Sequence, residues 1–294
     1  MLGTGELHIS QSKYILDLLR RASLSSSKPV PTPMLSSLKL TSDRSEPYEN
    51  PTLYRSLVRE LQYATLTHPE ISFSVNRVSQ FMKNPKQHHW TALKRILRYL
   101  SGTYHHGLCF QKSTDLRVLV FADADWASDT EDRRSTSGYC IFLGCNPVFW
   151  CSRKQTAVSR SSTEAKFRCL ADAGAEILWV LKLLQELRIS QPIAPTVYCD
   201  NLSAVMLSAN PILHSRSKHF EVDLHFVQDR VSKGQLHVIH ILADSQIADV
   251  LTKPLSTTSF EKFKNKLRVV PQPTMSLRGA VENHHALVTE ITNS

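Results

Sequence analysis

Four acidic residues are spaced so that one fold could bring them together. Asp123 lies on a predicted strand, Glu164 in the first turn of a long predicted helix, Asp200 at the end of a later strand and Asp249 in the last predicted helix. Strand ends and helix starts around the edge of a sheet commonly converge on one site. Carboxylates that crowd together repel one another and need cations. Oxygen ligands favour Mg²⁺ or Mn²⁺, and two such ions can stabilise both the attacking and the leaving oxygen of a phosphoryl displacement.

Each acid also has a simpler interpretation. Asp200, which precedes Asn201, could cap a helix, and Glu164 could interact with a helix dipole. Asp249 could be a surface acid. Asp125 is the alternative to Asp123, because residues two apart on a strand share a face. The spacing alone leaves these alternatives open.

The elements that must position these acids are predicted in the order three strands, a helix, a strand, two helices, a strand and a helix. The predicted strands are residues 116–124, 138–143, 148–152, 196–199 and 235–241. The predicted helices are residues 163–187, 202–209, 220–231 and 245–252. This order predicts an α/β fold, a mixed five-stranded sheet flanked by helices.

The upstream part is predicted to be mostly helical, with helices at residues 14–21, 52–66, 71–82 and 88–100. In the last of these, Lys94, Arg95 and Arg98 lie opposite an apolar face. They could be a solvated basic face or could contact a phosphate backbone.

Residues 256–294 lose periodicity after residue 267, and we expect a tail that is flexible after about residue 268.

Composition is typical of a globular protein: 294 residues, of which 41% are hydrophobic and 21% charged. The sequence contains neither an apolar run long enough for a membrane span nor a signal peptide. Six cysteines without a CxxC pair indicate reduced, intracellular thiols. The net charge of +9 is uneven, because residues 1–115 hold 15 Lys and Arg against 8 Asp and Glu, whereas residues 116–255 hold 15 of each.

At the four acids the sequence resembles the ribonuclease H domain of copia-type LTR retrotransposon Pol polyproteins. The matching blocks are FADADWA (121–127), DRRSTSGY (132–139), SSTEA (161–165), YCDN (198–201), HSRSKH (214–219) and ADVLTKPL (248–255). Upstream, KPVPTPM (28–34), YRSLV (54–58) and KRILRYL (94–100) resemble the segment that links the polymerase to ribonuclease H. The resemblance divides the chain into a thumb- or connection-like segment (1–112), a ribonuclease H-like domain (113–255) and a tail (256–294).

The resemblance implies hydrolysis of the RNA strand of an RNA–DNA hybrid. Asp123, Glu164, Asp200 and Asp249 would be both catalytic and metal-binding, with two Mg²⁺ ions, for which Mn²⁺ could substitute. Ser162, Thr163 and Asn201, next to these acids, could contact sugar or phosphate, although helix capping would explain them equally well. No small-molecule cofactor and no membrane are expected. The alternative is a decayed fragment that binds hybrid silently or is inert.

Two of the departures from the family pattern bear directly on this expectation. The Tyr-x-Asp-Asp turn of reverse transcriptases does not occur, so no polymerase activity is expected, and the missing polymerase domain becomes a candidate partner. A second acid commonly follows the Thr-Glu-Ala block, where this chain has Lys166. We expect this lysine to change the surface charge beside the site without removing a catalytic acid. The expected location is intracellular, either in the cytoplasm within a virus-like particle or in the nucleus.

Overall fold

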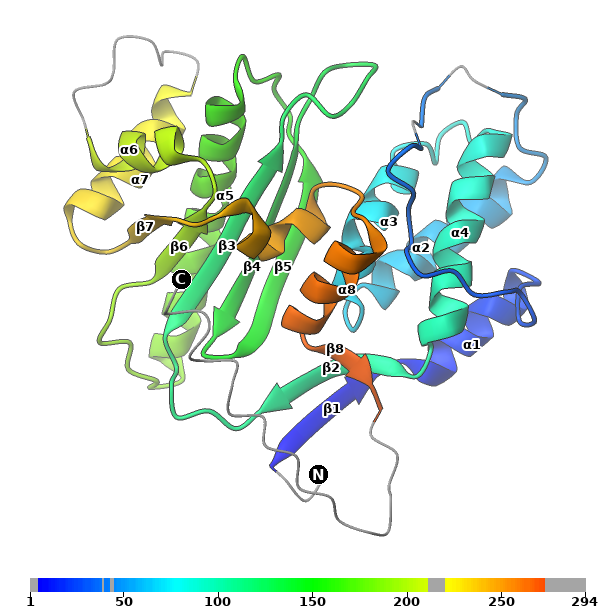
Figure 1. Cartoon of the computed structure of the whole chain (residues 1–294), viewed down its shortest axis with the longest axis horizontal. Coiled ribbons are helices and arrows are strands. Elements are labelled where there is room, and N and C mark those ends of the chain that lie inside the picture. The colour runs from blue at the N-terminus through cyan, green and yellow to red at the C-terminus, as the bar shows by residue number, and fades with distance from the viewer. Residues whose placement is uncertain (1–4, 39, 43–44, 211–219, 273–294) are drawn as a thin grey trace.

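A five-stranded mixed sheet forms the centre of the molecule in the computed structural model, which describes residues 5–38, 40–42, 45–210 and 220–272. Its strands are β3 (Val118–Asp125), β4 (Thr136–Leu143), β5 (Asn146–Lys154), β6 (Thr196–Cys199) and β7 (His237–His240). Their order across the sheet is β5-β4-β3-β6-β7 (Figure 1). β3 pairs antiparallel with β4 and parallel with β6. The predicted mixed α/β sheet flanked by helices is confirmed.

The two central strands alternate between two apolar cores, one on each face of the sheet. Val120 and Ala122 belong to the core on one face, and Phe121 belongs to the core on the other. Asp123 follows this alternation, so it shares a face with Phe121. Burial on both faces explains why β3 reads as a continuous apolar run rather than as an alternating strand.

Three helices cover the first face. These are α5 (Ser162–Glu186), α6 (Leu202–Ala209) and α7 (Glu221–Ser232). The hydroxyl of Ser161 accepts a hydrogen bond from the Glu164 N–H at 3.1 Å and so caps α5. Phe167 and Leu170 of α5 pack into the core with Val120 of the sheet. This packing fixes the start of α5 beside the ends of the central strands.

The other face is covered by elements from both ends of the chain. The helices upstream of the sheet are α1 (Ser12–Arg21), α2 (Pro51–Ala64), η1 (Pro69–Ile71), α3 (Ser72–Ser79) and α4 (Gln87–Thr103). The elements downstream of it are the short helices η3 (Ala243–Ser245) and η4 (Ile247–Leu251) and the helix α8 (Thr257–Lys266). Residues from both groups join sheet residues in one continuous apolar core. The proposed division at residue 112 therefore crosses a shared core, and it stays a prediction.

A second, three-stranded sheet joins segments that are distant in the sequence. It consists of β1 (Glu6–Ser10), β2 (His106–Gln111) and β8 (Val269–Pro271) in the order β1-β2-β8. The sequence did not predict these strands, nor α8. Phe260, Phe263 and Val269 are buried, so residues 257–271 are part of the core rather than the start of a tail. None of the described helices is both long and apolar enough to cross a membrane.

Candidate functional site

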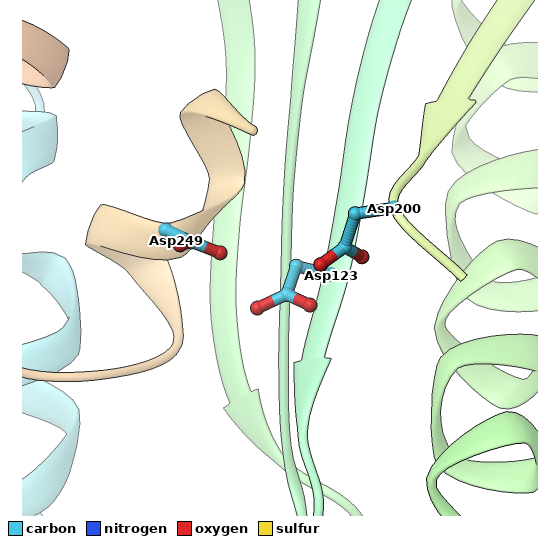
Figure 2. Close-up of side chains that lie close together, drawn as sticks. All are labelled: Asp123, Asp200 and Asp249. Atoms are coloured by element: carbon cyan, nitrogen blue, oxygen red, sulfur yellow. The ribbon is translucent and has the colours of Figure 1, made fainter. Parts of the chain in front are cut away.

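Three of the four predicted acids meet at one place. Asp123 lies on the central strand β3, Asp200 directly follows β6 and Asp249 lies on η4. Among the residues that the structure describes, one carboxylate oxygen from each lies within 4.8 Å of the other two. Figure 2 shows their side chains directed toward one another from three separate elements. The convergence that the strand ends predicted therefore holds for these three acids.

Asp249 reaches this cluster because η4 lies directly against the sheet. The amide of Gln246 donates to the carbonyl of Ala122, at 3.1 Å, and so anchors the start of η4 to β3. Gly138 on β4, opposite Asp123 in the register, has no side chain to hold η4 away. The predicted helix at residues 245–252 is thus a pair of short 3-10 turns, because the chain follows the sheet here rather than continuing as a free helix.

Asp123 is the most buried acid of the cluster, with 1% of its surface exposed. Its Oδ2 accepts a hydrogen bond from the Thr252 hydroxyl at 2.6 Å, and its Oδ1 accepts one from the Lys166 ammonium at 2.7 Å. Burial alone would raise the pKa of Asp123, but the positive charges of Lys166 and Lys253 outweigh burial and hold the pKa below its usual range. The two ammonium groups therefore favour the ionised form of Asp123.

Asp249 lies in a different electrostatic environment. Burial and the neighbouring charge of Asp123 raise the pKa of Asp249 above its usual range, although Lys253 opposes this. The Lys253 ammonium lies 2.9 Å from Asp249 Oδ1 and 3.7 Å from Asp123 Oδ2. Two acids of one cluster thus have pKa values displaced in opposite directions, as is common at functional sites.

Lys166 points into the cluster. The expectation that it would only change the surface charge beside the site is therefore wrong. Its ammonium pairs with Asp123 and also with Asp200, and its side chain is 13% exposed. Burial lowers the pKa of Lys166, but the two aspartates more than compensate and raise it. With Lys253, two ammonium groups face the three carboxyl groups of the cluster.

Glu164, the fourth predicted acid, lies outside this group of three. Its carboxylate accepts hydrogen bonds from the Arg160 backbone N–H at 2.9 Å and from the Arg168 guanidinium at 3.0 Å. It is buried, with 4% of its surface exposed. Its assignment as a metal ligand stays a prediction.

The acid cluster offers carboxylate oxygens at short range from three elements, and such oxygens are ligands that hard divalent cations prefer. Asp123, Asp200 and Asp249 could hold a divalent ion. Three further residues contact these acids, namely Lys166, Thr252 and Lys253. Sequence reasoning placed Lys166 beside the site and missed Thr252 and Lys253. Thr252 and Lys253 follow Asp249 by three and four residues, and that spacing was the available signal.

The predicted nucleic-acid contacts next to the acids lie at helix starts. The side chain of Asn201 accepts a hydrogen bond from the Ala204 N–H at 2.8 Å and caps α6. Ser162 and Thr163 are the first two residues of α5, and Ser162 is exposed. Capping thus accounts for Asn201, and contact with sugar or phosphate stays a prediction for all three.

Two of the three basic residues of α4 contact the segment between α1 and α2, and the third lies over a ring of its own helix. Arg95 donates to the Thr32 hydroxyl at 2.9 Å, and Arg98 donates to the Lys28 carbonyl at 2.8 Å. Lys94 lies 5.9 Å from the centre of the Trp90 ring. α3 and α8 lie between α4 and the sheet that carries the acids (Figure 1). These contacts explain Arg95 and Arg98 as links to the upstream segment at residues 28–34. Lys218 and His219, in the HSRSKH block, lie outside the described residues.

The most informative relatives are transposon polyproteins. The chain is 47% identical over 267 residues, 91% of its length, to the retrovirus-related Pol polyprotein from transposon RE2 of Arabidopsis thaliana. It is 37% identical over 266 residues to the corresponding polyprotein from transposon TNT 1-94 of Nicotiana tabacum. The chain belongs to the retrovirus-related Pol polyproteins of transposons. The predicted family is confirmed at this level.

This member of the Pol family spans about a fifth of the length of those relatives, 18% of the RE2 polyprotein and 20% of the TNT 1-94 polyprotein. No family model matches it. The solved structure of LC11-RNase H1 in complex with an RNA/DNA hybrid is similar over 46% of this chain and 94% of that chain, with a TM-score of 0.33 and 16% identity.

Proposed function

We propose that the chain is the ribonuclease H part of a copia-type retrotransposon reverse transcriptase and hydrolyses the RNA strand of RNA–DNA hybrids. The observation that supports this most directly is the convergence of Asp123, Asp200 and Asp249 within 4.8 Å in a Pol-family chain. These acids come from β3, the end of β6 and η4, so their meeting depends on the fold rather than on sequence proximity.

Asp123, Asp200 and Asp249 would hold Mg²⁺, for which Mn²⁺ could substitute, and Glu164 is the proposed fourth ligand. When bound, the metal would supply an activated water and stabilise the oxygen that leaves the phosphorus, a task for which two ions are proposed. Donor chemistry supports this assignment, because hard oxygen ligands from rigid elements suit a small divalent cation.

The side chains around the cluster would prepare it for this chemistry. Thr252 donates to Asp123 Oδ2 at 2.6 Å and so orients this carboxylate, whose Oδ1 pairs with Lys166. Burial keeps water from competing at Asp123. Lys253, which is partly exposed, brings positive charge to the edge of the site, where a phosphate backbone would approach. Contacts with the 2′-hydroxyl would select RNA, and Ser162, Thr163 and Asn201 are the proposed donors and acceptors.

The test is cleavage of a hybrid whose RNA strand carries a label, in Mg²⁺ or Mn²⁺. Asp123→Asn and Asp200→Asn should each slow cleavage more than about a hundredfold, because loss of a ligand should exceed the 10–100-fold effect typical of changes around one. Asp244→Asn, at an exposed acid on η3, is the matched control and should cleave like the wild type.

The alternative is a fragment of a decayed element that binds hybrid without cleaving it. The contact of Lys166 with two of the proposed ligands is the observation that favours this alternative. Equal inactivity of the wild type and the Asp123→Asn variant, with undiminished binding of hybrid by both, would replace the enzymatic proposal with this one. Inactivity without hybrid binding would indicate an inert fragment.

A further inference from the structure

We infer that Lys166 is an internal cation that holds the acid cluster together without a metal, and that a divalent ion must displace it to bind. This inference rests on the proposed function, because it concerns the same three aspartates. Lys166 is thus a positioning residue, and it sets the metal concentration at which the three aspartates bind an ion.

The contacts of Lys166 place its ammonium between two prospective ligands. Nζ lies 2.7 Å from Asp123 Oδ1 and also pairs with Asp200 Oδ1. The side chains of Asp123 and Asp200 are 0% and 11% exposed, so little solvent reaches the three groups. A divalent ion held by Asp123 and Asp200 would compete with the ammonium for these two carboxylates.

Charge explains why the cluster needs such a group. Three carboxylates within 4.8 Å repel one another strongly when they are partly buried. Lys166 and Lys253 supply two positive charges, and removal of Lys166 would leave Lys253 as the remaining ammonium group among these contacts. A buried charge that loses its partner is costly, so the acids would then bind another cation more tightly.

Lys253 differs from Lys166 in position. It lies four residues after Asp249 on the same short segment, and its side chain is 34% exposed. It therefore neutralises the edge of the cluster, whereas Lys166 reaches the centre from α5, on the other side of the sheet. A lysine on a flexible four-carbon stem can leave such a position without movement of the helix.

The experiment measures Mn²⁺ binding to the full chain by electron paramagnetic resonance, independently of any activity. Lys166→Gln and Lys166→Met should bind Mn²⁺ about 10–100-fold more tightly than the wild type, the range typical of changes to groups that contact metal ligands. Lys166→Arg, which keeps the charge, should bind as weakly as the wild type. Lys182→Gln, an exposed lysine on the same helix, is the matched control and should leave binding unchanged.

Thermal unfolding provides the second readout. Mn²⁺ should raise the melting temperature of Lys166→Gln more than that of the wild type, because the metal replaces the missing cation. Asp123→Asn combined with Lys166→Gln should lose the gain in affinity, which would locate the ion in the cluster.

Equal Mn²⁺ affinities of the wild type and both neutral variants would overturn the inference, as would variants that stay unfolded even in Mn²⁺. Hybrid cleavage, measured in parallel, separates the two proposals. If no variant cleaves hybrid but the neutral variants bind Mn²⁺ more tightly, the proposed function fails and the role of Lys166 stands.

Discussion

Asp129 shows how a single buried acid joins parts of the chain that are distant in sequence. It lies between β3 and β4, and its side chain is 5% exposed. Its Oδ2 accepts hydrogen bonds from Arg77 of α3 at 2.8 Å and from Lys154 of β5 at 2.7 Å. Burial opposes ionisation, but these two bonds outweigh it and hold the pKa of Asp129 well below its usual range.

This depressed pKa predicts a pH-dependent contribution to stability. The unfolded carboxyl has a pKa of about 3.9, so the stabilisation is fully present above that pH and is lost as the pH falls toward the lower pKa of the folded state. We expect Asp129→Asn to lower the free energy of unfolding by about 3 kcal/mol at pH 7, since it breaks a buried pair. The difference from the wild type should shrink below about pH 4.

Urea unfolding at several pH values checks this prediction. Asp17→Asn is the control, because Asp17 pairs with Arg20 at the surface, where such a change costs less than about 1 kcal/mol. A difference that stays constant between pH 7 and pH 3 would contradict the proposed ionic origin.

At the scale of elements, the position of η4 decides whether Asp249 belongs to the site. η4 packs on β4 at Gly138, where an added Cβ would lie 2.6 Å from Thr252 Cγ2 and 2.8 Å from Leu251 Cβ. Both distances are far below van der Waals contact. The glycine therefore allows the close approach that brings Asp249 and Thr252 to Asp123.

Gly138→Ala should push η4 away from the sheet. We expect it to lower the free energy of unfolding by about 1–3 kcal/mol, the usual cost of an extra methyl group in a packed interior. It should also weaken Mn²⁺ binding, because Asp249 would move from its partners. Chemical denaturation and Mn²⁺ titration of the same preparation test both effects.

Gly174→Ala is the matched control for this prediction. At Gly174 on α5 the added Cβ would meet the end of the Phe226 ring at 2.9 Å, and that flexible side chain can shift. Alanine also favours the helix by about 1 kcal/mol. If both variants kept the Mn²⁺ affinity of the wild type, η4 would not owe its position to Gly138.

At the scale of the whole molecule, the upstream helices share an apolar core with η4, which carries Asp249, and with α8. Val250 of η4 and Phe260 of α8 are 3% exposed, and both belong to the core that the upstream helices share. The ring of Phe260 lies 5.4 Å from that of Tyr99 on α4, edge to face. The Trp150 ring N–H donates to the carbonyl of Thr65, which follows α2, at 3.1 Å.

A chain of residues 113–294 should therefore be less stable than the full chain. Exposure of Val250 and Phe260 alone would cost about 1.5–3 kcal/mol each. We expect a lower melting temperature and binding of a dye that detects apolar surface, both measured beside the full chain. Equal melting temperatures without dye binding would instead support an independent domain that begins near residue 113.

Sequence periodicity and motif spacing determined a large part of this protein. The five strands of the main sheet, α5 and the meeting of Asp123, Asp200 and Asp249 could all be predicted. These features depend on local sequence. Apolar residues with a period of two or 3.6 predict strands and helices, and the positions of the acids at the ends of these elements predict that they meet. The sequence blocks also determined the family, which the transposon relatives confirm.

Tertiary structure alone decided the small sheet and the direction of Lys166. β2 pairs with β1 and β8 across more than 90 residues, and strands as short as β8 carry no distinct period. Lys166 has a flexible stem, and its position depends on which charges the fold brings near, here Asp123 and Asp200. Local patterns specify elements, whereas long-range pairing and the partner of a flexible charge are determined only when the whole chain is packed.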